Sequence, residues 1–486
     1  MGRDPSRCQG LARPVVTRKR IARARGRDRD RARATARRGA MTSDRDRRRR
    51  VSATSALDVP ALIPWMKRAC GDEDEGRAAR RARTVARACA RGARSGAMTL
   101  RECALEDVHG VPRRAVEALL RGEGGVALYT TRVAHESSSA DGSTTKLIVE
   151  LQDGHRVEAC VMRHAKGRTT LCVSSQVGCK MGCTFCATGT LGELGNLSSG
   201  EILEQLAHAG RVANVRNVVF MGMGEPLNNY DAVMGAIAVM TDDKVFGLSP
   251  ARVTVSTVGV IPRMRTLTRD APGTCLALSL HAPTQELRQK IVPTAVAYKL
   301  DELMRVLDEY LASGPKMKTM IEYCVLGGVN DDEECAEKLG ELFRGKEGKI
   351  ILNLIPLNPT DTPAGHVPPT PEAVRRMMEI LTKKYGLFVT KRHTMGDDIA
   401  GACGQLALKT PGEPDIEDMM APRRAASPAL TTKAAVKATQ AKPREPSATT
   451  PSIPSNARFE GAEYALLFVS ALSVGVLAYA WFSRRP

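Results

Sequence analysis

Between residues 169 and 390, short apolar segments alternate with segments of helical patterning, and this alternation limits the fold more than any other feature. Strands that alternate with helices pair in parallel, because each helix crosses over the sheet before the next strand begins. Six strands fall short of the eight that close a barrel, so the sequence predicts an α/β fold with a partial (β/α)6 barrel. The predicted strands are 170–175, 217–223, 252–257, 274–280, 319–326 and 350–355, and the predicted helices are 199–209, 229–241, 285–291, 301–312, 332–343 and 371–385.

Three cysteines, Cys179, Cys183 and Cys186, follow the first predicted strand in the pattern C-x3-C-x2-C. Thiolates at this spacing can bind three corners of a cubic iron–sulfur cluster, which leaves the fourth iron open. Closed electron-transfer clusters and structural zinc sites both use four protein ligands. An open iron can instead chelate a small molecule. The alternatives are a zinc site that borrows a distant ligand and core cysteines that bind no metal.

Glycines and polar residues follow the later strands at their carboxyl ends, where α/β barrels carry their chemistry. Gly224 would let a ligand approach the backbone, and Glu225 can accept a hydrogen bond from an ammonium group. Similar positions at the ends of other strands are Ser256, Ser279, His281 and Asn358. Each of these residues alone fits turn chemistry equally well. Together they indicate a ligand site only because they follow the cysteine motif in order along the chain.

The chain has 486 residues, which is enough for two or three domains. Its net charge of +19 is concentrated in residues 1–50, which hold 19 Lys or Arg against 5 Asp or Glu. The charge therefore says little about nucleic-acid binding by the rest of the chain. The 13 cysteines are scattered and odd in number, which indicates a compartment that keeps thiols reduced.

The domains predicted between the ends are a small helical accessory domain at 56–125, a β-hairpin region at 126–168 and a core at 169–410. The hairpin is predicted because Asp153-Gly154 lies between two apolar runs, 147–151 and 156–162.

The two ends of the chain differ from its middle. Residues 1–55 are rich in Arg and Ala, which predicts either an organelle transit peptide or a solvated basic tail. Residues 411–463 have the composition of a flexible linker. Tyr464 to Phe482 is a run of 19 residues without a charge, long enough to cross a bilayer as one C-terminal transmembrane helix. We therefore expect a membrane-anchored protein of the chloroplast or another organelle, with the cytoplasm as the alternative.

The motifs of the core resemble the RlmN/Cfr family of radical-SAM adenine methyltransferases over about residues 75–409. In family order these motifs are TLCVSSQVGC with the cysteine pattern, MGMGEP, STVG, SLHAP, NLIPLNP and GDDIAGACGQL. The resemblance implies a radical-SAM fold, a 4Fe–4S cluster on the three cysteines, and S-adenosylmethionine as cosubstrate. The S-adenosylmethionine contacts that it implies are Gly224, Glu225, Ser256, Ser279, Leu280, His281 and Asn358.

The resemblance also implies a reaction, methylation of carbon 2 of an adenine in 23S rRNA and in some tRNAs. That carbon is electron-poor and cannot attack a sulfonium. In the family a C-terminal cysteine, here Cys403, is methylated first, and a 5′-deoxyadenosyl radical then takes hydrogen from its methyl group. The resulting radical adds to adenine. Cys172 then attacks the Cys403 sulfur and leaves a disulfide, while Glu158 matches the base that removes the adenine proton.

The partners implied are RNA and an electron donor such as flavodoxin or ferredoxin, and we expect a monomer. Methylation of carbon 8, as in the Cfr branch, or action on tRNA alone stays open, because both use the same cysteines. A membrane-tethered iron–sulfur protein without catalysis is an alternative of another class. Cys172 and Cys403 argue against it, because a scaffold needs neither thiol.

Overall fold

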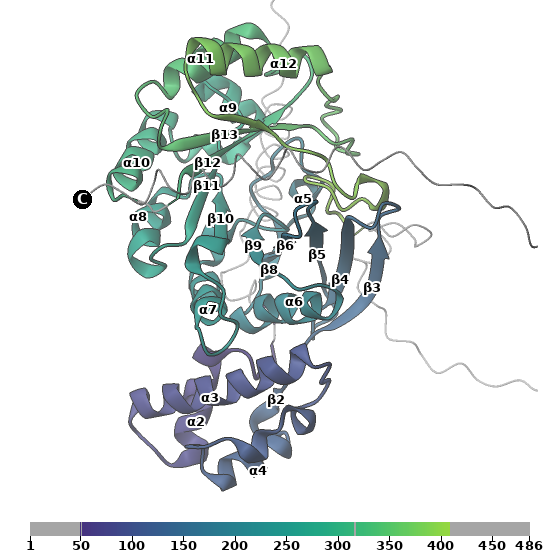
Figure 1. Cartoon of the computed structure of the whole chain (residues 1–486), viewed down its shortest axis with the longest axis vertical. Coiled ribbons are helices and arrows are strands. Elements are labelled where there is room, and N and C mark those ends of the chain that lie inside the picture. The colour runs from purple at the N-terminus through teal and green to yellow at the C-terminus, as the bar shows by residue number, and fades with distance from the viewer. Residues whose placement is uncertain (1–48, 50, 315–316, 409–486) are drawn as a thin grey trace, which may run out of the picture. The chain divides into compact units, whose positions relative to one another are not determined.

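The computed structural model describes residues 49, 51–314 and 317–408, and an open, mostly parallel sheet lies at its centre (Figure 1). The strands of this sheet are β3 (Arg132–Ser138), β4 (Thr144–Glu150), β5 (Arg156–Arg163), β6 (Thr169–Cys172), β9 (Asn217–Phe220), β10 (Val253–Thr257), β11 (Cys275–Ser279), β12 (Thr319–Val325), β13 (Ile350–Pro356) and β14 (Val389–Lys391). In the described residues their order is β14-β13-β12-β11-β10-β9-β6-β5-β4-β3. Neighbours from β6 to β14 run parallel, whereas β3, β4, β5 and β6 run antiparallel.

The predicted parallel sheet is confirmed, since each of the six predicted strands is present as β6 or one of β9 to β13. The structure adds β14 and β3, one at each edge. β14 is only three residues long, and β3 is exposed or half-buried throughout, so neither carries a clear apolar signal. In the described part of the chain these edges do not pair with one another, so the sheet stays open.

Helices connect the parallel strands and lie close to their predicted positions. They are α6 (Ser199–Val212), α7 (Tyr230–Thr241), α8 (Ile261–Asp270), α9 (Gln285–Ile291), α10 (Leu300–Ala312), α11 (Glu333–Leu342) and α12 (Pro371–Glu379). The sequence analysis missed α8, because Pro262 and the polar residues after it resemble a loop. Proline is tolerated in the first turn of a helix, and Met264 and Leu267 are buried one turn apart. The predicted helix 371–385 ends at Glu379 and continues as a π-helical turn, Ile380–Lys384.

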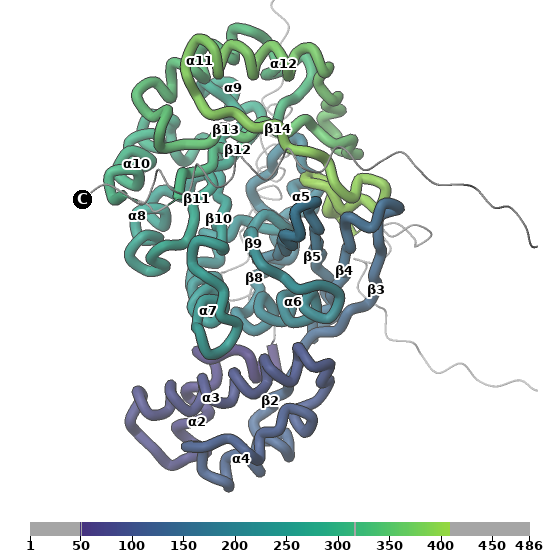
Figure 2. The backbone as a smooth tube through the Cα atoms, viewed as in Figure 1, coloured from purple at the N-terminus to yellow at the C-terminus, as the bar shows by residue number. Residues whose placement is uncertain are grey.

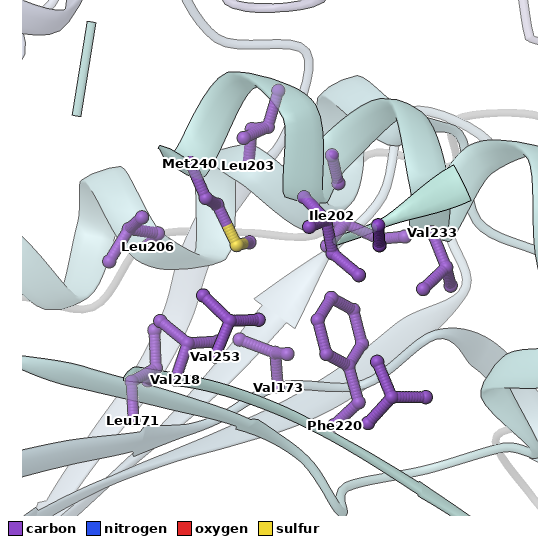
Figure 3. Close-up of a cluster of buried hydrophobic side chains, with 14 of the residues drawn as sticks. Leu171, Val173, Ile202, Leu203, Leu206, Val218, Phe220, Val233, Met240 and Val253 are labelled. Carbon is purple, nitrogen blue, oxygen red and sulfur yellow. The ribbon is translucent and has the colours of Figure 1, made fainter. Parts of the chain in front are cut away.

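The hydrophobic core beneath α6 and α7 fixes these helices on the sheet (Figure 3). Figure 3 shows apolar side chains of the strands facing apolar side chains of the two helices. Removing such side chains from water contributes roughly 1.5–3 kcal/mol each. The labelled residues are all buried or nearly so: Leu171, Val173, Val218, Phe220 and Val253 from the sheet side, and Ile202, Leu203, Leu206, Val233 and Met240 from the helices.

The predicted helical domain contains α2 (Val59–Cys70), α3 (Glu75–Arg94) and α4 (Arg113–Leu120). Within this domain, residues 99–108 form the 3-10 turns η1 (Leu100–Cys103) and η2 (Leu105–Asp107) and no α-helix. The Arg/Ala-rich composition of α3 reflects a small-residue core face, with Ala78, Ala82 and Ala86 fully buried. A short parallel pair, β1 (Thr54–Ser55) with β2 (Val126–Ala127), closes the domain.

The last described segment returns alongside the hairpin, as Figure 2 shows by its yellow-green tube beside the blue β3 and β4. The Ala140 N–H donates to Asp398, and the Leu408 N–H donates to the Glu158 carboxylate at 3.1 Å. This return brings residues near 400 to the strand ends of the sheet.

The predicted membrane helix, Tyr464 to Phe482, lies outside the described residues. Among the described residues, no helix is both long and apolar enough to cross a bilayer. Most of the predicted basic extension, 1–55, is likewise not described.

A candidate active site at the carboxyl ends of the strands

The cysteine loop is framed by a small antiparallel pair, β7 (Gln176–Cys179) and β8 (Gly192–Asn196). Cys179 ends β7, and Cys183 and Cys186 follow before the short helix α5 (Ala187–Thr190). All three cysteines line one cavity of about 920 Å³. Burial, with the neighbouring Cys186 sulfur and other negative groups, raises the pKa of Cys179 to about 12. Burial raises the pKa of Cys183 as well, so these thiolates need a cationic partner.

The donor set fits the predicted 4Fe–4S cluster. Its three ligands are soft thiols on one short loop, and each would bind a different iron, so they need not converge on one point. Consistently, no group of three or more His, Cys, Asp or Glu side chains within the described residues could hold a single metal ion. Arg288 lies nearby, fully buried, and its charge opposes the other influences on the Cys183 pKa.

Gly224 and Glu225 line the same cavity where β9 ends. Gly224 has φ +99°, and a Cβ there would lie 2.6 Å from the Gln176 side chain, so only glycine fits. The carboxylate of Glu225 accepts hydrogen bonds from the N–H groups of Leu227 and Val258, both at 3.0 Å. Burial raises the pKa of Glu225 to about 7 despite these bonds. When ionised, this carboxylate offers the cavity a negative charge that an ammonium group could meet.

The next strand ends add neutral polar groups to the cavity. Ser256 and Ser279 face one another across β10 and β11, with 3.1 Å between their hydroxyl oxygens. His281 has φ +63°, and its Nδ1 accepts from the Cys324 N–H at 3.0 Å. Its ring is therefore neutral with hydrogen on Nε2, in line with burial that lowers its pKa to about 3. The side chain of Leu280 lies in the hydrophobic core and does not line the described cavity, so its predicted contact stays a prediction.

Cys403 lies where this cavity meets another. The second cavity, of about 550 Å³, is lined by Cys403 together with Cys172 from the end of β6. Asn358 lines both cavities and donates from its side-chain amide to the Cys403 carbonyl at 3.0 Å, which fixes the backbone there. Cys172 is 6% exposed, and burial and the Cys403 sulfur raise its pKa to about 12. The structure thus places the two predicted catalytic thiols in one cavity.

Glu158 is fully buried, although a hairpin carboxylate would ordinarily face solvent. One oxygen lies 3.2 Å from the Lys146 ammonium on β4, and the other accepts from the Leu408 N–H. Burial raises the pKa of Glu158, and the Lys146 charge opposes that rise. Glu158 is therefore held next to the segment that carries Cys403 and shares its face of β5 with Cys160, but it lines neither described cavity.

Arg392, which the sequence analysis did not select, lines both cavities just after β14. Its guanidinium lies 3.7 Å from the buried Glu322 carboxylate. The Cys403 sulfur, followed by Glu322 and Cys172, raises the pKa of Arg392 against the effect of burial. The charge of Arg392 opposes the rise in the pKa of Cys172 and so favours the thiolate form of that residue. The sequence signal that could have identified Arg392 is its position at the end of a strand, shortly before the Cys403 motif.

The whole arrangement is related to known proteins by sequence and by structure. Residues 173–339 match the Radical SAM superfamily. The chain is 39% identical over 327 residues to a probable dual-specificity RNA methyltransferase RlmN 2 of Opitutus terrae, which covers 59% of this chain and 75% of that protein. It is 43% identical over 277 residues to the dual-specificity RNA methyltransferase RlmN 1 of Myxococcus xanthus, covering 56% and 76%. The crystal structure of a radical SAM methyltransferase from Sphaerobacter thermophilus matches with a TM-score of 0.63 and 33% identity, covering 73% of this chain and 99% of that one.

Proposed function

Because the chain belongs to the RlmN family of radical-SAM RNA methyltransferases, we propose that it methylates carbon 2 of an adenine in large-subunit ribosomal RNA and in some tRNAs. The observation that carries this proposal is the position of Cys403. It lines the cavity of the three cysteines and Glu225, and it also lines the cavity of Cys172. One thiol can therefore receive a group on one side and deliver it on the other.

The cofactors are a 4Fe–4S cluster and S-adenosylmethionine. Cys179, Cys183 and Cys186 would hold the cluster, and Glu225 would accept from the amino group of S-adenosylmethionine, with Ser256, Ser279 and His281 around the remainder. When bound and reduced, by a donor of the flavodoxin or ferredoxin class, this pair supplies a carbon radical that can abstract hydrogen. Side chains of the protein itself then carry the methyl group to adenine and release it.

Cys403 first takes the methyl group of S-adenosylmethionine through its sulfur and becomes a thioether. After it loses one hydrogen atom, its methylene carbon bonds to adenine carbon 2, and the adduct gives up one electron, for which the bound cluster would be the acceptor. Glu158, which is paired with Lys146, takes the proton from adenine carbon 2. Cys172 then attacks the Cys403 sulfur, so the bond from sulfur to the methylene carbon breaks, that carbon takes up a proton and becomes the methyl group, and a Cys172–Cys403 disulfide forms. Arg392 stabilises the thiolate that makes this attack.

The carbon that is methylated decides between this proposal and its alternative. RNA treated with the reconstituted enzyme would be hydrolysed to nucleosides and compared with 2-methyladenosine and 8-methyladenosine by chromatography and mass spectrometry. We expect 2-methyladenosine, formed only when S-adenosylmethionine and a reductant are present. 8-Methyladenosine would assign the chain to the carbon-8 branch, and the absence of any methylated adenosine would support the non-catalytic alternative.

We also propose that Tyr464 to Phe482 anchors the enzyme in an organelle membrane and that residues 1–55 direct it there. The support is the uncharged run of bilayer length and the Arg-rich composition of the N-terminal segment. A reporter fused to residues 455–486 should resist carbonate extraction from membranes. A reporter recovered fully in the soluble fraction would contradict the anchor.

A further inference from the structure

Cys160 is a thiol that the proposed reaction does not use, yet it lines the same cavity as Cys172 and Cys403. Its side chain is 2% exposed. It lies on β5 directly opposite Cys172 of β6 in the antiparallel register. Residues opposite each other in such a pair point to the same face of the sheet, so both thiols face the cavity. A Cβ built on Gly401, two residues before Cys403, would lie 3.6 Å from the Cys160 sulfur.

The register allows a disulfide between Cys160 and Cys172. Opposite residues in an antiparallel pair have Cα atoms about 4.5 or about 5.5 Å apart. Disulfides span Cα distances of about 4.4 to about 6.8 Å. Both antiparallel spacings lie within this range, so the bond can form without a shift of either strand.

We propose that Cys160 exchanges into the disulfide that product release leaves behind, an inference that rests on the proposed function. The Cys160 sulfur attacks the Cys172 sulfur, a Cys160–Cys172 bond forms, and the Cys172–Cys403 bond breaks. The proton of Cys160 ends on Cys403, and the exchange leaves the number of disulfides and thiols unchanged. Cys403 is thereby returned as a thiol that can take another methyl group, while the oxidising equivalent moves to the two sheet residues.

The position of Cys160, more than the charges around it, fits this role. Lys146 is its partner on β4, so Lys146, Cys160 and Cys172 form one row across three strands. Burial, Cys172 and Glu158 raise the pKa of the Cys160 thiol, and Lys146 opposes them. The thiolate is thus a minor species, but its fixed position opposite Cys172 gives the exchange a high effective concentration.

The test maps disulfides in the full-length, reconstituted enzyme after one turnover on RNA without added thiol. Acid quenching and alkylation would be followed by trypsin, which places the three thiols on separate peptides, 157–163, 169–180 and 393–409. We expect wild-type protein to hold linked Cys160 and Cys172 with an alkylated Cys403. Cys160→Val, which suits a strand, should instead hold linked Cys172 and Cys403. Cys275→Val, at a strand cysteine that lines neither described cavity, should match wild type.

Wild-type enzyme that holds only the Cys172–Cys403 link, with Cys160 alkylated, would overturn the exchange and leave the proposed function intact. This arm needs no variant, so a failure of Cys160→Val to fold cannot obscure it. Methylated RNA formed by Cys160→Val without any Cys172–Cys403 link would overturn the role of Cys172 itself, and the exchange with it.

Discussion

Lys146 and Glu158 lie 3.2 Å apart with side chains that are 1% and 0% exposed, so each charge depends on the other. A lone carboxylate at this depth would take up a proton, because burial already raises the pKa of Glu158. A protonated Glu158 cannot accept the adenine proton. Lys146 is therefore a positioning residue that keeps the base ionised.

Replacing Lys146 with methionine should raise the pKa of Glu158 further. We expect the pH at which product formation rises to move upward, because only the carboxylate can take a proton, and Lys146→Arg should restore the wild-type profile. Removal of one partner of a buried ion pair also costs about 3–5 kcal/mol of folding stability. The pH profile of single turnovers and urea unfolding would measure the two effects. A profile that stays in place in Lys146→Met would contradict the role.

Glu225 gives the binding of S-adenosylmethionine a pH dependence of definite sign. Its pKa is about 7, and only the ionised carboxylate attracts an ammonium group. Affinity should therefore fall as the pH drops through about 7, by about tenfold per unit below it. Calorimetric titration between about pH 6 and about pH 8 would measure this, with Glu225→Gln weaker and independent of pH. Wild-type affinity that does not change over this range would contradict the assignment.

The cysteines Cys179, Cys183 and Cys186 were predicted from their spacing, whereas Cys172 and Cys403 were predicted from the family resemblance. Lys146 and Arg392 were not found, because a lysine in a hairpin strand and an arginine after a short strand are ordinarily solvated. Their roles come from burial beside a carboxylate and beside two thiols. Leu280 was predicted from a motif, but its side chain belongs to the core.

At the scale of elements, Arg49 joins the hairpin to the helix after the cysteine loop. Its side chain, 3% exposed, pairs with Asp153 in the turn between β4 and β5 and with the fully buried Glu201 of α6. Burial raises the pKa of Asp153, but the hydrogen bonds and charge of Arg49 outweigh it and hold this pKa below its usual value. The pairing of Arg49 with Asp153 contributes stability that is present above about pH 4 and is lost as the pH falls through the lowered pKa of Asp153.

Arg49→Met should therefore destabilise the protein most near neutral pH, by about 1–3 kcal/mol, because it leaves two carboxylates without their partner. The difference in free energy of unfolding between the variant and wild type should shrink at acid pH, where the carboxylates protonate. Urea unfolding at several pH values would measure this. Arg101→Met serves as the control, because Arg101 is exposed and makes no ion pair within the described residues. An equal loss at all pH values would contradict the ionic account.

Comparison of the predicted with the observed helices and strands shows which elements leave a clear pattern in the sequence. The strands of the parallel sheet were predicted within a few residues, because buried strands read as continuous apolar runs. Helix α8 was missed because its proline hid a valid first turn. Residues 99–108 have helical composition, but they turn through Ala104 at φ 49°, which divides them into η1 and η2. Tertiary packing decided these cases, and local propensity did not.

At the scale of the molecule, the fold brings the last described segment back over the sheet, so that Cys403 meets residues from β6 and from the cysteine loop. The sequence indicated the three cysteines of the loop and the two catalytic thiols, but it did not indicate that two adjoining cavities share Cys403. That arrangement follows from the return of residues 392–408 along the hairpin, a contact between segments about 250 residues apart. The central claim is that Cys403 carries the methylene to RNA and Cys172 releases it.

The most direct test of this claim is the RNA adduct of the Cys172→Ala enzyme. Without the second thiol, the bond between the Cys403 methylene and adenine cannot be broken by disulfide formation. Labelled RNA should migrate with Cys172→Ala protein on a denaturing gel, and Cys172→Ala combined with Cys403→Ala should show no such band. Mass spectrometry of the digested adduct should place the nucleotide on Cys403. Full turnover by Cys172→Ala without an adduct would contradict the account.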